Sequence, residues 1–196
     1  GNDSIHVSAG ASGSIVQGGV GNDSYSYGRA GGRVSLFDNY SEWDGAESSF
    51  AGVDKRYHAG NDTLIMRDLS REQVVMRLSG DDLEIGIKEE GKAFSGLSDV
   101  LTIKNWKNAN NRIETIRFTD AKVTIANLSL ETSDMGDSLS WTDSAVRVTG
   151  GSGNDTITTG NYGDTVITGS GANKVFTSGG NDSIHVSAGA SGSIVQ

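Results

Sequence analysis

Aliphatic residues recur every nine positions along the last third of the chain. They keep one phase through six consecutive turns: Leu139, Val148, Ile157, Val166, Val175 and Ile184. Two residues before them, an acidic or amide side chain occupies every turn but one: Asp137, Val146, Asp155, Asp164, Asn173 and Asp182. A short strand with one core-facing residue, followed by a tight turn, produces such a period. Two nonapeptides are then expected to complete one coil of a solenoid.

Glycine occupies the turns between these strands. The two best copies are Gly18 to Ser26 and Gly150 to Thr158, and partial copies begin at Gly1 and Gly60. Glycine permits a positive φ, so we expect the turn carbonyls to point inward beside the Asp carboxylate. Adjacent coils then surround a cation with six or more hard oxygen ligands, which favours Ca²⁺ over Mg²⁺. A metal-free solenoid would not need Asp at one phase, and stacked carboxylates repel one another without a cation.

These segments match the pattern G-G-x-G-x-D, followed by a free residue, an aliphatic residue and a second free residue. The chain therefore resembles the RTX (repeats-in-toxin) haemolysin-type calcium-binding repeat proteins. The resemblance implies several Ca²⁺ ions, held by Asp side chains and by carbonyls of the turn glycines. The expected metal ligands are Asp3, Gly18, Gly19, Gly21, Asp23, Asp62, Asp137, Gly150, Gly151, Gly153, Asp155, Asp164, Asn173 and Asp182.

The repeat pattern decays at a few positions. Val146 replaces an Asp, Asn173 is a neutral and weaker ligand, and Tyr162 occupies the phase of a turn glycine. The resemblance also implies a second Asp-bearing turn after the Tyr-rich repeat, where this chain has Gly31-Gly32-Arg33-Val34. We therefore expect one calcium site to be lost there.

The nine-residue period disappears between about Met66 and Leu128. Alternating apolar and polar residues predict strands at Val74–Leu78, Leu83–Lys88, Val100–Trp106, Ile113–Phe118 and Val123–Ala126. One helical turn with Ser70 as its cap is expected between Asp68 and Gln73. The block resembles the haemolysin-type calcium-binding protein related domain in three segments: Gly80 to Ile85, Leu101 to Trp106 and Arg112 to Asp120.

The expected fold class is all-β, namely a calcium-bound parallel β-roll (β-solenoid) with a small antiparallel β block inserted between or capping roll segments. Residues 1–66 are expected to form the first roll segment, 67–130 the capping or insert domain, and 131–196 the second roll segment. Residues 180–196 repeat residues 1–17 letter for letter, at an offset of 179. Tandem units of that length explain the repetition, as does a sequence cut to overlap itself.

Charge and composition limit the classes of binding partner that the chain can have. A net charge of −9 argues against nucleic acid and against an anionic membrane surface, and favours a multivalent cation. The chain has no cysteine, which excludes disulfides and zinc–thiolate sites. No apolar run is long enough to span a membrane. The three histidines form no recognisable catalytic set, so we expect no enzyme activity. Trp43, Trp106 and Trp141 are expected to pack in a core or cap.

Together these features favour a calcium-dependent structural repeat unit of a large secreted or surface-displayed bacterial protein, acting as a stiff extender in an adhesin or matrix fibre. Its expected partners are neighbouring copies of the 179-residue unit and a ligand on a cell surface or in a matrix. Calcium would drive folding after export, and the resemblance implies a type I secretion route. Two alternatives stay open: a receptor-binding repeat region of a toxin, and a secretion module of an enzyme.

Overall fold

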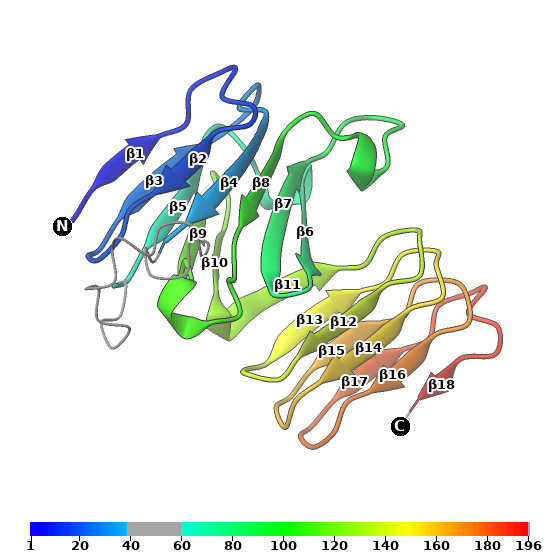
Figure 1. The fold of residues 1–196 in the computed structure, drawn as a ribbon. Helices are drawn as coiled ribbons and strands as arrows, with labels where there is room; N and C mark the ends of the chain where they lie inside the picture. Colours follow the sequence, from blue (N-terminus) through cyan, green and yellow to red (C-terminus); the bar gives the residue numbers. More distant parts are fainter. Residues whose placement is uncertain (39–59, 196) are drawn as a thin grey trace. The chain divides into compact units, whose positions relative to one another are not determined.

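The computed structural model describes residues 1–38 and 60–195 of the chain. Over these residues the protein is all-β, which confirms that part of the expected fold class, and its helical turns are of the 3-10 type. The calcium-bound parallel β-roll stays a prediction. None of these turns is long and apolar enough to cross a membrane. The chain divides into two compact units (Figure 1): unit 1 is Gly1–Lys92 with Gly96–Lys122, and unit 2 is Ala93–Ser95 with Val123–Gln196.

Unit 2 contains two four-stranded sheets, with the orders β11-β13-β15-β17 and β12-β14-β16-β18. Every strand pairing described within them is parallel. The strands are β11 (Leu128–Glu131), β12 (Ser138–Trp141), β13 (Val146–Thr149), β14 (Thr156–Thr159), β15 (Thr165–Ile167), β16 (Lys174–Phe176), β17 (Ser183–His185) and β18 (Ile194–Val195). Because Val148 pairs with Val166 and Ile157 with Val175, successive coils of unit 2 are offset by two nonapeptides.

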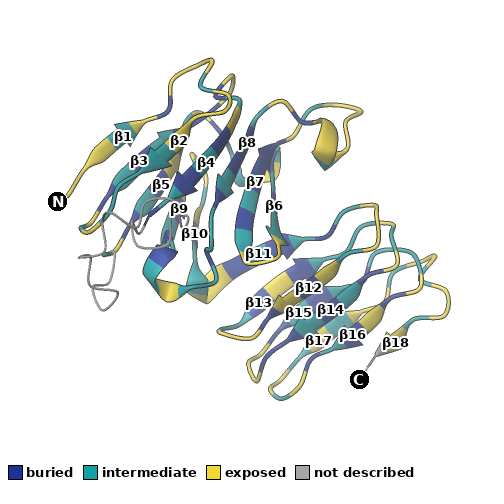
Figure 2. Cartoon of the chain, in the orientation of Figure 1, coloured by how far each residue is buried: buried dark blue, intermediate teal, exposed yellow. Residues whose placement is uncertain are grey.

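The nine-residue period places its aliphatic residues in the core of unit 2. Five of the six are buried, and Ile184 in the last coil is half-buried. Figure 2 shows buried positions alternating with more exposed ones along these strands, and further exposed positions in the turns. Successive strand residues point to opposite faces, so each of these short strands turns only one or two aliphatic residues into the core.

Unit 1 contains two five-stranded sheets, with the orders β1-β3-β5-β9-β10 and β2-β4-β8-β7-β6. The strands are β1 (Ser4–His6), β2 (Ile15–Gln17), β3 (Ser24–Tyr27), β4 (Arg33–Phe37), β5 (Thr63–Met66), β6 (Val74–Ser79), β7 (Asp82–Ile87), β8 (Val100–Ile103), β9 (Thr115–Arg117) and β10 (Lys122–Thr124). Five pairs are parallel: β1 with β3, β2 with β4, β3 with β5, β4 with β8 and β5 with β9. The pairs β6–β7 and β7–β8 are antiparallel, so the second sheet is mixed.

The middle of the chain extends the sheets of the first repeats. All five strands expected there are present, although β8 ends at Ile103, β9 begins at Thr115 and β10 ends at Thr124, so all three are shorter than expected. β8 and β9 continue the parallel ladders of β4 and β5, and the antiparallel pairing is confined to β6, β7 and β8. The chain therefore covers the edges of β4 and β5 with its own strands.

The remaining short elements of the middle segment are helical turns. They are η3 (Arg71–Gln73), η4 (Phe94–Gly96), η5 (Ala109–Asn111) and, at the start of unit 2, η6 (Ile125–Asn127). Ser70 is the N-cap residue of η3, as expected, and its backbone N–H donates in turn to Oε1 of Gln73 at 2.9 Å. Trp106 and Trp141 are buried, in agreement with the expected core role, whereas Trp43 lies outside the described residues.

Candidate metal centre

The turns of unit 2 lie against the backbone of the adjacent coils. A Cβ added to Gly150 would lie 2.1 Å from the carbonyl oxygen of Thr168, and one added to Gly151 would lie 2.1 Å from that of Ser133. No side chain fits at these distances, so both positions require glycine for close approach of two backbones. The repeat glycines thereby stack turn carbonyl oxygens at the edge of the unit.

A ladder of carboxylates accompanies these stacked turns. Oδ1 of Asp155 accepts a 2.9 Å hydrogen bond from the backbone N–H of Asp137, one coil earlier. On the other edge, Oδ1 of Asp164 accepts from Val146 and Oδ1 of Asp182 accepts from Asp164, both at 2.9 Å. One oxygen of each carboxylate therefore holds the coils together, and the second oxygen is left for another partner.

The second carboxylate oxygens have different surroundings. Oδ2 of Asp164 is buried without a hydrogen-bond partner, and so is Oγ1 of Thr159, which ends the preceding strand β14. Oδ2 of Asp155 accepts a 2.7 Å bond from the Thr132 hydroxyl, and burial raises the pKa of this carboxyl. A buried carboxylate oxygen without a partner is strongly destabilising unless a proton or a cation binds it, so the Asp164 turn fits a metal ion.

Unit 1 contains a denser group of acidic side chains. Asp23, Asp38 and Asp62 each offer a carboxylate oxygen within 4.8 Å of the other two. The three residues are 2%, 0% and 1% exposed, and the Oδ2 atom of each has no hydrogen-bond partner. Three buried oxygens converging on one point form a donor set suited to a hard divalent cation.

Backbone N–H groups orient two of these carboxylates. The N–H of Asp3 donates to Oδ1 of Asp23 at 2.7 Å, and the N–H of Asp23 donates to Oδ1 of Asp62 at 2.6 Å. The N–H of Asp62 in turn donates to Oε2 of Glu114 at 2.7 Å. The ladder of unit 2 therefore recurs in unit 1, and Glu114 takes the position of the next Asp.

Tyr25 and Gly18 shape the space around the cluster. The Tyr25 hydroxyl donates a 2.7 Å hydrogen bond to Oδ1 of Asp38, in a buried position. A Cβ on Gly18 would lie 2.0 Å from that hydroxyl oxygen and 2.3 Å from Oδ2 of Asp23. Glycine at position 18 is therefore needed to leave room for the carboxylates.

The protonation of the cluster reflects its burial. Burial has the largest effect on the pKa of Asp38 and raises it; the Tyr25 hydrogen bond comes next and lowers it, and the neighbouring Asp62 and Asp23 raise it again, so that the net shift is upward. Burial also raises the pKa of Asp62, with an opposing contribution from the Asp23 N–H. Burial and the adjacent Asp38 raise the pKa of Tyr25, so its phenol keeps its proton. The carboxyl groups must therefore share either protons or a cation.

The expected ligands occupy unequal environments. Asp23 and Asp62 converge with Gly18, whereas Asp3 is exposed and Asp137 and Asp182 are half-buried. Gly19 and Gly21 adopt positive φ values of 84° and 142°. Gly153 again packs closely on the preceding coil, because its Cβ would lie 2.5 Å from the backbone of Met135. Which of these groups bind metal stays a prediction.

Asp38 was not anticipated from the sequence. It follows β4 directly, and the pairing of Gln17 with Phe37 puts it in register with Gly18, at the first position of a turn. The nonapeptide pattern places Asp only at the sixth position. The one sequence signal was an acidic residue immediately after an apolar strand, at a coil-to-coil distance from Gly18.

The asparagines that precede the repeat aspartates have a structural role. Oδ1 of Asn2 accepts from the N–H of Asn22 at 2.8 Å, and Oδ1 of Asn22 accepts from the N–H of Asn61 at 2.9 Å. Each Asn thus bonds to the following coil, while the Asp after it bonds to the preceding coil. The hydrogen bonds between coils therefore explain why Asn recurs before Asp, and Asn does not need to bind a metal ion.

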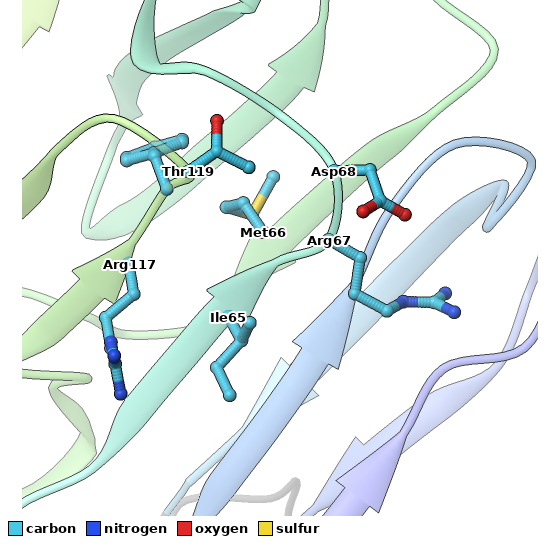
Figure 3. A pocket seen from close by; sticks show the side chains of 7 residues that line it. Ile65, Met66, Arg67, Asp68, Arg117 and Thr119 are labelled. Atoms are coloured by element: carbon cyan, nitrogen blue, oxygen red, sulfur yellow. The ribbon is translucent and has the colours of Figure 1, made fainter.

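A surface depression of unit 1 has a different chemistry. Arg67 and Arg117 extend from its rim, beside the exposed Ile65 (Figure 3). The Arg67 guanidinium also donates to the carbonyl of Val7 at 2.7 Å. Two guanidinium groups repel a cation, so the depression is not a candidate metal site.

Two family models match the chain. The RTX calcium-binding nonapeptide repeat matches residues 149–184 and 158–191, and the haemolysin-type calcium binding protein related domain matches residues 82–124. The first match contains Asp155, Asp164, Asn173 and Asp182 of the ladder of unit 2, and the second contains β7 to β10 of unit 1. No curated protein matches the chain significantly. The repeat match and the related-domain match together support an RTX haemolysin-type calcium-binding protein.

Proposed function

We propose that the chain is a calcium-stiffened structural repeat unit of a large secreted or surface-displayed bacterial RTX protein, and that it acts as an extender in an adhesin or matrix fibre. The observation that carries the calcium part is the convergence of Asp23, Asp38 and Asp62, whose buried second oxygens have no hydrogen-bond partner. The RTX nonapeptide match supports the same ion for the turns of unit 2.

Calcium would act by removing a repulsion that the fold creates. Stacking the coils brings carboxylates together at both edges of unit 2 and inside unit 1. Their second oxygens and the turn carbonyls are hard donors, and their number and flexible spacing suit Ca²⁺. Since the unfolded chain does not bring these groups together, the binding free energy of the ions becomes folding free energy. Such a chain would stay unfolded where calcium is scarce and fold outside the cell.

The identical segments 1–17 and 180–196 support tandem assembly. In unit 1, the carbonyl of Asp3 accepts from β3 at 2.8 Å and the N–H of Val7 donates to β3 at 2.9 Å. In unit 2, the N–H of Ser183 donates at 2.8 Å to the residue before β15, and the carbonyl of His185 accepts at 3.0 Å from the residue after β15.

These two sets of hydrogen bonds do not overlap. Ser183 and His185 repeat Ser4 and His6, whereas unit 1 uses the groups of Asp3 and Val7. Alternate residues of a strand direct their backbone groups to opposite edges, so one coil can use both sets at once. We infer that segment 180–196 can receive the coil 18–37 of a next copy, which continues the parallel ladder without a linker.

Calcium counting tests the central function. Native mass spectrometry of the whole chain in volatile buffer with added calcium should show several bound ions. The pair of changes Asp23→Asn and Asp62→Asn should remove at least one ion, because the amides keep the Oδ1 acceptors but lose the charge. Asp81→Asn is the matched control, since its side chain is 72% exposed. A wild-type chain that binds no calcium would overturn the function.

A further inference from the structure

Asn173 stands in the carboxylate ladder without a charge. It is 1% exposed and occupies the phase of Asp137 and Asp155 on the same edge of unit 2. Its Oδ1 accepts a 2.8 Å hydrogen bond from the N–H of Asp155, as the aspartates do in the other coils. This bond fixes the orientation of the amide group, because a backbone N–H needs an oxygen opposite it.

The Nδ2 group of Asn173 consequently lies where an aspartate would have its second oxygen. It faces three carbonyl oxygens of its own turn: that of Thr168 at 3.0 Å, that of Ser170 at 3.0 Å and that of Gly171 at 3.5 Å. An amide N–H₂ carries two donors and no acceptor at this atom, so each near carbonyl is satisfied. A carboxylate oxygen in the same place would face the same carbonyls with no donor between them.

The aspartate on the opposite edge provides the comparison. Oδ1 of Asp164 makes the equivalent ladder bond to Val146, but its Oδ2 is buried without a partner. At the position of the second side-chain atom, the Asp164 turn therefore has an oxygen without a donor, whereas the turn of Asn173 has the Nδ2 donor group.

We propose that the Asn173 amide is a built-in substitute for a calcium ion, so that the turn 168–173 closes without metal and Asn173 is not a ligand. The partial positive charge of the N–H₂ group binds the turn carbonyls that a cation would otherwise bind. Unit 2 then has one coil contact, between Asp155 and Asn173, that forms independently of calcium. This inference rests on the proposed calcium function and specifies which turn of the unit is exempt from it.

Ion counts of three variants test the proposal, by native mass spectrometry at saturating calcium. Asn173→Asp should bind one ion more than the wild type, because it restores an acidic turn. Asn173→Ala should bind the same number as the wild type, since no ligand is removed. Asn154→Asp is the control for added charge: Asn154 is exposed, its Oδ1 accepts from Ala172, and its count should not change.

The calcium concentration at half-maximal β-structure, measured by circular dichroism, gives a second readout. It should shift upward in Asn173→Asp and in Asn173→Ala, because both lose the metal-free turn. An unchanged count in Asn173→Asp, one ion fewer in Asn173→Ala, or failure of Asn173→Asp to fold in excess calcium would each overturn the proposal. A wild-type chain without any bound calcium would instead refute the proposed function itself.

Discussion

The hydroxyl of Tyr25 donates a 2.7 Å hydrogen bond to Oδ1 of Asp38, thirteen residues further along the chain. Tyr25 occupies the aliphatic phase of its nonapeptide and is fully buried, so the bond links the core of unit 1 to the beginning of the next turn. Asp38 also offers a carboxylate oxygen within 4.8 Å of those of Asp23 and Asp62, and its Oδ2 is buried without a hydrogen-bond partner. A core residue thereby completes a candidate metal site that the turn motif alone does not describe.

Replacement of Asp38 should weaken one calcium site without unfolding the calcium-loaded chain. Asp38→Asn keeps an acceptor for Tyr25 and removes one of three converging charges. Calorimetric titration should show one class of sites weakened by at least about tenfold, which corresponds to roughly 1.4 kcal/mol. Asp81→Asn serves as the control, because Asp81 is exposed at the β6–β7 turn. Equal affinities for Asp38→Asn and the wild type would remove Asp38 from the site.

The two oxygens of Asp164 can be separated by mutation. Asp164→Asn retains the oxygen that accepts from Val146 and replaces the buried, unpartnered one. Asp164→Ala removes both. We expect each variant to bind fewer calcium ions, and only Asp164→Ala to show faster hydrogen exchange at the Val146 amide in calcium. If Asp164→Asn bound the full number of ions, its carboxylate would not be a ligand.

The close approach of adjacent coils can be tested at Gly150. Gly150→Ala would put a Cβ 2.1 Å from the carbonyl oxygen of Thr168 and should destabilise the calcium-loaded chain by about 1 to 3 kcal/mol. Gly96→Ala is a suitable comparison, because its nearest atom, on Lys92, would lie 4.0 Å away. Urea denaturation measures both. Similar midpoints for the two variants would show that the coils can move apart with little loss in the free energy of unfolding.

Acid should partly replace calcium. Burial raises the pKa values of Asp38 and Asp62 in the metal-free fold above the unfolded value of about 4. Groups with raised pKa values stabilise the fold below the unfolded pKa, and this stabilisation is lost as the pH rises through the folded pKa. In chelator, circular dichroism should therefore show more β-structure near pH 5 than near pH 8. Calcium affinity should rise with pH over the same interval, with protons released on binding; a pH-independent affinity would contradict this.

The sequence predicted the strands of this fold better than their partners. The nine-residue period identified Val148, Ile157 and Val166 as core residues because one side chain per short strand faces inward. A period of two identified β8 and β9 as strands, but it carries no information on pairing, so their parallel ladders with β4 and β5 were not foreseen. Pairing depends on which edge is open after the first coils have formed.

The sequence likewise predicted the site residues that depend on a local motif and missed those that depend on contacts between coils. Asp23 and Asp62 were found because the turn motif repeats locally. Asp38 was missed, since it reaches the cluster through the register of β2 with β4, a contact between coils. The amide of Asn173 appeared as a weak ligand in the sequence, because its donors toward the turn carbonyls are evident only once the turn is closed. Contacts that form only when coils stack and turns close cannot be read from a single position of the repeat.

Tandem assembly can be tested with two copies joined through their shared segment, residues 1–179 followed by 1–196. Segment 180–196 would then bond to β15 on one edge and to the next copy on the other. Small-angle scattering in calcium should show an elongated particle with no flexible junction, and a single unfolding transition should link the adjoining units. Two independent transitions and a flexible junction would argue against a continuous ladder.

The most direct test of the account is a calcium titration of the chelator-treated chain, followed by far-ultraviolet circular dichroism. Within each unit, the neighbouring carboxylates repel one another when no cation is bound. The chain at neutral pH should therefore change from irregular to β-structure as calcium is added. Magnesium at the same concentration should have little effect, because it fits flexible, many-ligand oxygen sites poorly. A full β-spectrum in chelator at neutral pH, unchanged by calcium, would contradict the claim that calcium binding drives folding.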